Sequence, residues 1–276
     1  MTEFDNLISE LKPGIVAVLG VPFDENSSFL RGAALAPQRI REVLHSGASN
    51  LCTESGLDLR ANKRWRELGD LELSSDKKVF SQIAKAIATL LNRDARVLTL
   101  GGDHSITLPI LRAYARKYPK LNVLHLDAHA DLYDELDGNR YSHATPLLRS
   151  LEEKLAARLV QLGIRTMTPQ EHERSKHFGV ETIEMRYWHP DISLKFEGPV
   201  YLTLDIDCLD PAFAPGISHH EPGGFTTRDV LGIIHDLDVP LVGADIVEFN
   251  PKRDPLGVTA MVAVKFLKEI VGQMLG

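Results

Sequence analysis

Acidic and imidazole side chains gather at four points of this 276-residue sequence, each at or just after the end of a short apolar run. In chain order the clusters are His104, the trio Asp127, His129 and Asp131, the pair Asp205 and Asp207, and finally Glu248. Apolar runs of this length are typical of buried strands, and open α/β sheets bind ligands at the carboxyl ends of their strands. We therefore predict that these side chains meet at one site.

The spacing within the clusters indicates a metal centre. Side chains two residues apart near a strand end point in one direction, so Asp127, His129 and Asp131 converge, as do Asp205 and Asp207. Carboxylates crowded at one point raise one another's pKa values unless cations neutralise them. A pair of divalent ions meets this need. The oxygen-rich ligand set favours Mn²⁺, while affinity alone also allows Zn²⁺, Co²⁺ or Ni²⁺.

Each cluster taken alone also has a structural interpretation. An Asp at the end of a strand often forms a turn or caps a helix, and an Asp-X-His pair is common by chance. Because four clusters follow successive predicted strands, we prefer the metal centre. Two such ions would lower the pKa of a bound water and so provide hydroxide as a nucleophile.

The clusters lie in motifs that resemble those of the ureohydrolases, the family of arginases and agmatinases. The motifs are Gly101-Gly102-Asp103-His104-Ser105, Asp127-Ala128-His129-Ala130-Asp131, Ser142-His143-Ala144-Thr145-Pro146, Asp205-Ile206-Asp207-Cys208-Leu209-Asp210-Pro211 and Asp245-Ile246-Val247-Glu248-Phe249-Asn250-Pro251. The resemblance includes residues 22–29 and spans nearly the whole chain. It is closest to the branch that contains plant-type arginases and agmatinase-like bacterial enzymes.

The resemblance assigns roles to these residues. It implies six metal ligands: His104 and Asp131 on one ion, His129 and Asp207 on the other, and Asp127 and Asp205 as bridges between them. It also implies an acid/base or shuttle role for His143. Glu248 would bind the guanidinium, since a carboxylate can accept two parallel hydrogen bonds from that group. Asp131 would orient the nucleophile, and either Asp131 or a protonated His143 would give a proton to the leaving amine.

The motifs specify the substrate less sharply than the family. Residues 142–146 resemble agmatinases, although many of those have Gly where this chain has Ala144, and an acidic cleft suits a doubly cationic substrate. We therefore expect hydrolysis of agmatine to putrescine and urea, with Asn139 and Ser142 contacting the far end of the substrate. Arginase activity, giving L-ornithine and urea from L-arginine, is the alternative. Arg140, Asn139 and Ser142 would then bind the α-carboxylate.

Two interpretations of another class stay open. A single-zinc deacetylase would share the Asp-X-His element but has no use for six ligands. A catalytically silent metal-binding subunit would not need all of them intact. The sequence gives no role to His219 and His220, which stand in the Pro- and Gly-rich stretch 208–225. His125 also receives no role, and a hydrogen-bonded core histidine is its better interpretation.

The elements that must position these residues alternate between short apolar runs and longer segments of helical period. This pattern predicts a three-layer α/β/α fold with a mostly parallel central sheet, and the resemblance implies the arginase-deacetylase type. Strands are expected at residues 15–21, 97–100, 123–126, 159–162, 200–205 and 242–247. Helices are expected at residues 37–46, 78–91, 108–118, 147–157, 227–237 and 258–274. No linker divides the chain, so we predict a single domain over residues 1–276.

The composition of the chain indicates which classes of partner and which compartment to expect. The formal charge is −7 and the basic residues form no runs, so a nucleic-acid partner is not expected. No apolar run reaches the about 18 residues of a membrane span, and the first residues lack a targeting pattern. The two cysteines, Cys52 and Cys208, indicate a reducing compartment. We expect a cytoplasmic enzyme for a small guanidino substrate, and the resemblance implies a homo-oligomer, either a trimer or a hexamer.

Overall fold

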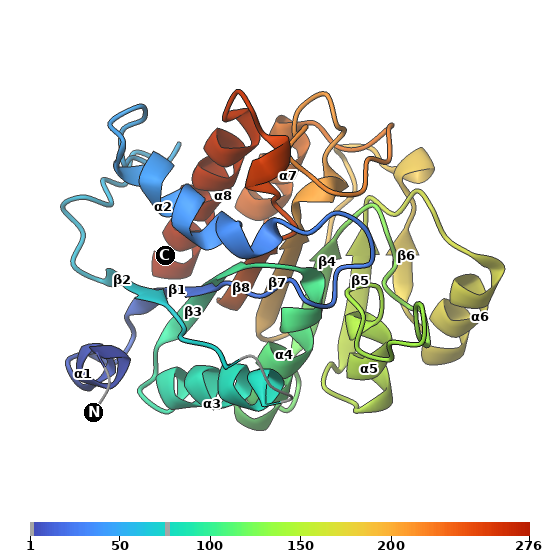
Figure 1. Ribbon diagram of the computed structural model, residues 1–276, viewed down its shortest axis with the longest axis horizontal. Helices are drawn as coiled ribbons and strands as arrows, with labels where there is room; N and C mark the ends of the chain where they lie inside the picture. The colour runs from blue at the N-terminus through green and yellow to red at the C-terminus, as the bar shows by residue number, and fades with distance from the viewer. Residues whose placement is uncertain (1–2, 75–77) are drawn as a thin grey trace.

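One parallel sheet runs through the computed structural model, which describes residues 3–74 and 78–276 (Figure 1). Its strands are β1 (Val16–Val21), β2 (Trp65–Asp70), β3 (Arg96–Gly101), β4 (Asn122–Leu126), β5 (Arg158–Leu162), β6 (Glu181–Ile183), β7 (Val200–Asp205) and β8 (Leu241–Val247). They lie in the order β2-β1-β3-β8-β7-β4-β5-β6, and every pairing is parallel. The predicted fold class is confirmed. The division into domains stays a prediction, which the single sheet supports.

Helices cover both faces of the sheet (Figure 1). On one face lie α2 (Ala36–His45), α7 (Thr227–His235) and α8 (Val258–Leu275); on the other lie α3 (Val79–Leu91), α4 (Thr107–Lys117) and α5 (Pro146–Glu152). Each face has its own cluster of buried apolar side chains. The short helix α1 (Glu3–Ser9) lies beside β2, and α6 (Pro169–Phe178) lies near the opposite end of the sheet. No helix within the described part of the chain is long and apolar enough to cross a bilayer.

The order of the central strands explains why distant clusters meet. Strands β3 and β4 are consecutive in the sequence, but β8 and β7 lie between them in the sheet. The chain changes its direction of travel across the sheet at this point, and such a reversal leaves a crevice at the carboxyl ends of the strands. Strands β4, β7 and β8 are buried along their whole length, as expected where helices cover both faces. The four central strands therefore deliver their polar ends into one crevice.

All six predicted strands and all six predicted helices are present. Their first and last residues differ from the predicted ones by two residues or fewer, with one exception. The exception is α5, which ends at Glu152 rather than at Ala157. There Lys154 adopts a left-handed conformation with φ 55°, and the N–H of Leu155 bonds to the carbonyl of Ser150. This closing arrangement ends a helix even where the apolar pattern continues.

Two strands and two helices of the described structure, β2, β6, α1 and α6, were not predicted from the sequence. Strands β2 and β6 form the two edges of the sheet, and most of their side chains are at least partly exposed, so they lack an apolar run. Helix α6 has few apolar residues, so its periodicity is weak. Its ends are nevertheless marked, because Thr168 and Glu171 form a capping box and Gly179 adopts the left-handed conformation after the last turn.

Candidate metal centre and active site

Short turns at the strand ends hold the acidic side chains. The carboxylates of Asp103, Asp127 and Asp205 each accept a hydrogen bond from the backbone N–H two residues further on, at 3.0, 2.6 and 2.7 Å. The turn-forming role expected of an isolated Asp is therefore real. At Asp127 and Asp205 this turn is compatible with the predicted metal role, because the second oxygen of each carboxylate lies near His104 Nδ1.

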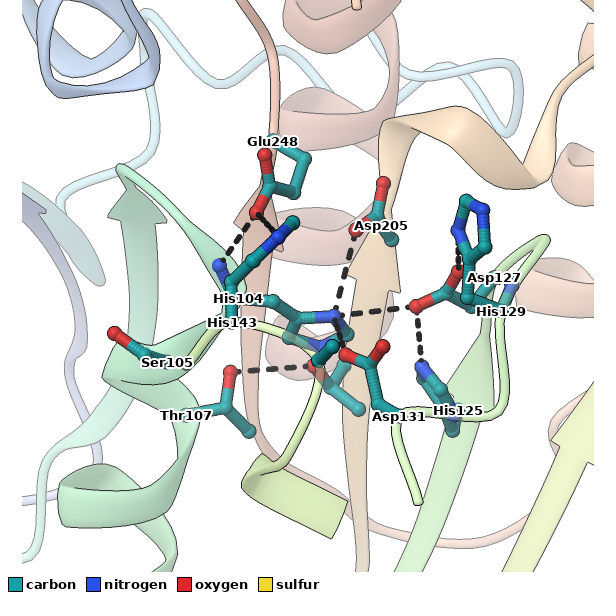
Figure 2. A network of polar contacts seen from close by, with 12 residues as sticks. His104, Ser105, Thr107, His125, Asp127, His129, Asp131, His143, Asp205 and Glu248 are labelled. Carbon is teal, nitrogen blue, oxygen red and sulfur yellow. Dashed lines mark hydrogen bonds and ion pairs between the residues drawn. The ribbon is translucent and has the colours of Figure 1, made fainter. Parts of the chain in front are cut away.

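The first candidate ligand group surrounds the buried imidazole of His104 (Figure 2). Its Nδ1 atom lies 2.9 Å from Asp131 Oδ2, 3.2 Å from Asp127 Oδ2 and 3.4 Å from Asp205 Oδ2. Despite this crowding, Nδ1 has no hydrogen-bond partner among the described residues. A buried nitrogen without a partner is rare, and three carboxylate oxygens beside it complete the donor set of a cation. These residues therefore fit a divalent metal ion.

Hydrogen bonds behind His104 fix which nitrogen carries its proton. Nε2 lies 2.9 Å from the hydroxyl of Thr203, which itself donates to Asp245 Oδ1 at 2.6 Å. Because the hydroxyl gives its only hydrogen to the carboxylate, it must accept from His104 Nε2–H. Nδ1 of the neutral imidazole then keeps its lone pair and faces the carboxylates, as a metal ligand must.

The second candidate group is centred on His129, whose imidazole is partly exposed. Its Nδ1 atom lies 3.0 Å from Asp207 Oδ2 and 3.4 Å from Asp127 Oδ1. Asp127 thus offers one oxygen to each group, which is the arrangement that a bridging carboxylate needs. Asp205 contributes an oxygen to the first group, and its bridging role stays a prediction.

The acidic groups repel one another, as the sequence predicts. Burial raises the pKa of Asp205 well above its usual value, and the charges of Asp207 and Asp127 raise it further. The pKa of Asp207 is raised by burial and by the charge of Asp127. Bound cations remove this penalty, because they favour the charged carboxylates.

His143 and Glu248 form a pair beside the metal ligands (Figure 2). Nδ1 of His143 lies 3.0 Å from Glu248 Oε1, and its Nε2 lies 2.8 Å from the hydroxyl of Ser28. Burial disfavours the charged imidazole, but the charge and hydrogen bond of Glu248 outweigh burial and raise the pKa of His143 to about 9. The sequence did not single out Ser28 as a site residue, and its only signal is the motif-like stretch 22–29.

Two of the predicted catalytic residues adopt a strained backbone. Asp131 has φ 55° and Glu248 has φ 63°, in the left-handed region that side chains with a Cβ rarely occupy. Strain of this kind persists where the surrounding structure enforces it, often at functional sites. The backbone therefore turns sharply where these two carboxylates enter the site.

A cavity of about 180 Å³ lies over these groups. The cavity is lined by four of the predicted metal ligands, by the pair His143 and Glu248, and by five further side chains. The lining residues are Ser28, His129, Asp131, Tyr133, Leu136, His143, Ala144, Asp205, Asp207, His219 and Glu248. His219 is one of these lining residues, and its ring centroid lies 5.1 Å from that of His143. His220 is exposed, and its Nε2 atom contacts the carbonyl of Pro215.

The two further residues predicted to contact the substrate do not line this cavity. The amide of Asn139 donates to Asn26 and accepts from the N–H of Tyr141, which holds the loop together. The side chain of Ser142 is buried, and its hydroxyl accepts a hydrogen bond from the N–H of Ala144. Both residues support the loop that carries His143, and contact with substrate stays a prediction for them.

The arginase family model matches residues 15–272 of this chain. The chain belongs to the arginase family. It is 45% identical over 275 residues to arginase 1 of Arabidopsis thaliana, covering 94% of this chain and 80% of that protein. It is 38% identical over 261 residues to an agmatinase of Blochmanniella floridana, covering 89% and 84%. Its fold is similar to that of the Medicago truncatula arginase, with a TM-score of 0.89, 39% identity and coverage of 99% and 91%.

Membership of the family confirms the predicted class of enzyme. The chain is a hydrolase of guanidino groups, from a family whose members carry a binuclear metal centre, and the deacetylase interpretation is replaced. The prediction of a cytoplasmic protein is wrong, because the similar arginases of Arabidopsis and rice are named as mitochondrial or chloroplastic enzymes. Composition and the charge of a few residues carry too little information to decide a compartment.

Proposed function

We propose that this chain hydrolyses agmatine to putrescine and urea at a centre that holds two Mn²⁺ ions. The observation that carries the choice of substrate is the absence of a cationic side chain from the cavity. No lysine or arginine occurs among the described residues that line it. Three of its four carboxylates, Asp131, Asp205 and Asp207, are predicted metal ligands whose charge the ions would neutralise, and Glu248 remains for a cationic group. L-Arginine differs from agmatine by an α-carboxylate, and a site selects for such a group only with donors aimed at it.

The donors that arginine would need are engaged elsewhere. The guanidinium of Arg140 lies 3.0 Å from both Asp134 and Glu152, on the outside of the loop. The amide of Asn139 is used by its neighbours in the same loop. A cationic tail without a carboxylate therefore suits this cavity better than an amino-acid head.

Arginine is the second candidate, and the comparisons supply the observation that favours it. The Arabidopsis relative at 45% identity is named an arginase, whereas the agmatinase of Blochmanniella floridana is 38% identical. Overall identity reflects the whole chain, while the cavity is what meets the substrate. For this reason we place agmatine first.

The chain's own residues account for the remaining steps. Ions held by the six predicted ligands supply Lewis acidity, which lowers the pKa of water to near neutrality. Glu248 lines the cavity, and its second oxygen, Oε2, can accept a guanidinium N–H. Asp131 can orient the attacking oxygen. His143 keeps a proton at neutral pH, and the hydroxyl of Ser28 connects its Nε2 atom to the cavity where the leaving amine forms.

The test compares substrates at equal metal loading. Urea release is measured with agmatine, L-arginine and 4-guanidinobutyrate after loading with Mn²⁺, and kcat/KM should be at least about tenfold higher for agmatine. A higher value for arginine would transfer the proposal to the second candidate. Elemental analysis should approach two Mn²⁺ per chain, and full activity with one tightly held zinc would overturn the two-ion centre. Light scattering on the same sample tests the proposed trimer or hexamer.

A further inference from the structure

A row of polar side chains crosses the sheet directly beneath the metal ligands. Strand register places its members opposite one another on six neighbouring strands: Thr99, Asp245, Thr203, His125, Gln161 and Thr182. All but the last are fully buried. Buried polar groups cost free energy unless they are hydrogen-bonded, so a row of them in the middle of a sheet calls for a physical explanation.

One arm of the row ends on a predicted metal ligand. Nε2 of His125 lies 2.8 Å from Asp127 Oδ2, as Figure 2 shows, and its Nδ1 lies 3.0 Å from Gln161 Nε2. The same amide nitrogen donates to the carbonyl of Ala130 at 2.7 Å, and the amide oxygen accepts from Thr182 at 3.2 Å. These four contacts leave no polar atom of the His125 and Gln161 side chains without a partner.

The contacts fix the proton of His125. The amide group of Gln161 has two hydrogens, of which one goes to Ala130 and the other to His125 Nδ1. A flipped amide would place its oxygen against the carbonyl of Ala130, so this orientation is enforced. Nδ1 must then accept, and Nε2 carries the hydrogen that is donated to Asp127.

This assignment excludes His125 as a direct ligand. Its ring lies close enough to count among possible ligands, since suitable atoms of His104, His125, Asp127 and Asp131 all lie within 4.8 Å of one another. A nitrogen that carries hydrogen has no lone pair for a metal, and the other nitrogen is occupied by Gln161. His125 therefore acts on the metal centre only through Asp127.

We infer that His125 and Gln161 are positioning residues that fix the rotation of the Asp127 carboxylate. The inference rests on the metal centre proposed above. The hydrogen bond to Oδ2 holds that oxygen 3.2 Å from His104 Nδ1 and leaves Oδ1 facing His129. The backbone N–H of His129 also binds Oδ1, so the two hydrogen bonds together direct one oxygen to each ligand group, and loss of the donor from His125 leaves Oδ2 less firmly placed. Partners of this kind typically change metal affinity 10- to 100-fold when removed.

The experiment is a Mn²⁺ titration of the metal-free, full-length protein, followed by calorimetry or electron paramagnetic resonance. Removing the donor in His125→Phe should weaken Mn²⁺ binding 10- to 100-fold while two equivalents still bind at saturation. Gln161→Met keeps the imidazole and should weaken binding by a smaller factor. Thr99→Val is the matched control, because Thr99 belongs to the same row but its hydroxyl has no partner in the described structure. It should bind as the wild type does.

The outcomes separate this inference from the proposed function. Wild-type protein that binds no second Mn²⁺ overturns the proposed centre itself. If the wild type binds two ions and both variants match it within twofold, only the inference is overturned. Loss of one whole equivalent at saturation in His125→Phe would make His125 a ligand and also overturn it.

A spectroscopic measurement on unaltered protein needs no variant to fold. The ¹⁵N chemical shifts of the His125 ring should report the tautomer with hydrogen on Nε2. Hydrogen on Nδ1 in the wild type would contradict the positioning role. The two measurements together test both the orientation and its effect on the metal.

Discussion

One oxygen of Glu248 holds two parts of the active site at once. Oε1 lies 3.0 Å from His143 Nδ1 and 2.9 Å from the backbone nitrogen of His104. An oxygen with two hydrogen bonds has used both lone pairs, so only Oε2 remains for a substrate. We therefore expect Glu248 to offer a guanidinium one oxygen in place of two parallel acceptors. Its other oxygen links His143 to the backbone of His104, a predicted metal ligand.

We expect Glu248→Gln to lower kcat/KM at least about tenfold with the metal content intact. The amide oxygen can still serve His143 and His104, but its NH₂ group then faces a guanidinium, which also donates. Hydrogen bonds to charged groups contribute roughly 1.5–3 kcal/mol, and losing one accounts for the tenfold effect. Glu221→Gln is the control and should keep normal activity. Loss of metal in the Glu248 variant would instead identify a ligand or ligand support.

The pair formed by His143 and Glu248 predicts that the stability of the metal-free protein depends on pH. The pKa of His143 rises from about 6.5 to about 9, which corresponds to roughly 3 kcal/mol. Because the folded value is the higher one, this contribution is fully present below pH 6.5 and is lost as the pH rises through 9. Denaturation of wild type and His143→Gln between pH 6 and 10 should show a gap that closes with rising pH. In a Glu248→Gln background the gap should be small throughout, and a gap that widens with pH would contradict the pairing.

Asp205 and Asp207 should differ in their effect on metal content. Asp205 is the predicted bridge, so Asp205→Asn should lower occupancy at both sites. Asp207 is the predicted ligand of one ion and contacts the imidazole of His129, so Asp207→Asn should keep about one equivalent of Mn²⁺. Asp210→Asn is a matched control from the same motif, because its carboxylate accepts backbone N–H groups at Ala212 and Gly223. Equal small losses in the first two variants would argue against a bridge.

The sequence singled out the candidate ligands because they stand at or just after apolar runs that become buried central strands. The fold class followed from the same alternation of strand and helix. The edge strands β2 and β6 escaped notice because an exposed edge has no apolar pattern to detect. The spacing of apolar residues along the chain was thus enough to predict the strands that are buried on both faces.

Contacts between strands could not be predicted in the same way. His125 lies opposite Gln161 on the neighbouring strand, and His104 forms a hydrogen bond with Thr203. Both contacts depend on the order of the strands and on their register, which local spacing in the sequence does not encode. Ser28 reaches His143 from a loop 115 residues away in sequence. Such partners come from the assembled sheet and its loops, so the sequence indicated the candidate ligands but not the residues that hold them in place.

Arg165 provides the last prediction, because its guanidinium ends among backbone carbonyls. It donates to the carbonyl oxygens of Gly163, Asp207, Cys208, Leu209 and Glu221, at distances from 2.6 to 3.2 Å. The charge lies at the end of the short helical turn Ile206–Cys208, where carbonyl groups point outward and favour a cation. Arg165 thus connects the turn that carries Asp207, a predicted metal ligand, to the Pro- and Gly-rich loop.

We expect Arg165→Met to lower the free energy of unfolding by at least about 2 kcal/mol, because several partly buried carbonyls lose a charged donor. The looser turn should also weaken Mn²⁺ binding in the group that contains His129 and Asp207. Arg165→Lys keeps the charge but offers three donors in place of five, so it should fall between the wild type and the Met variant. Chemical denaturation and Mn²⁺ titration on the three proteins measure both effects. A Met variant as stable as the wild type, with two ions bound at unchanged affinity, would show that the loop and the turn hold their places without this side chain.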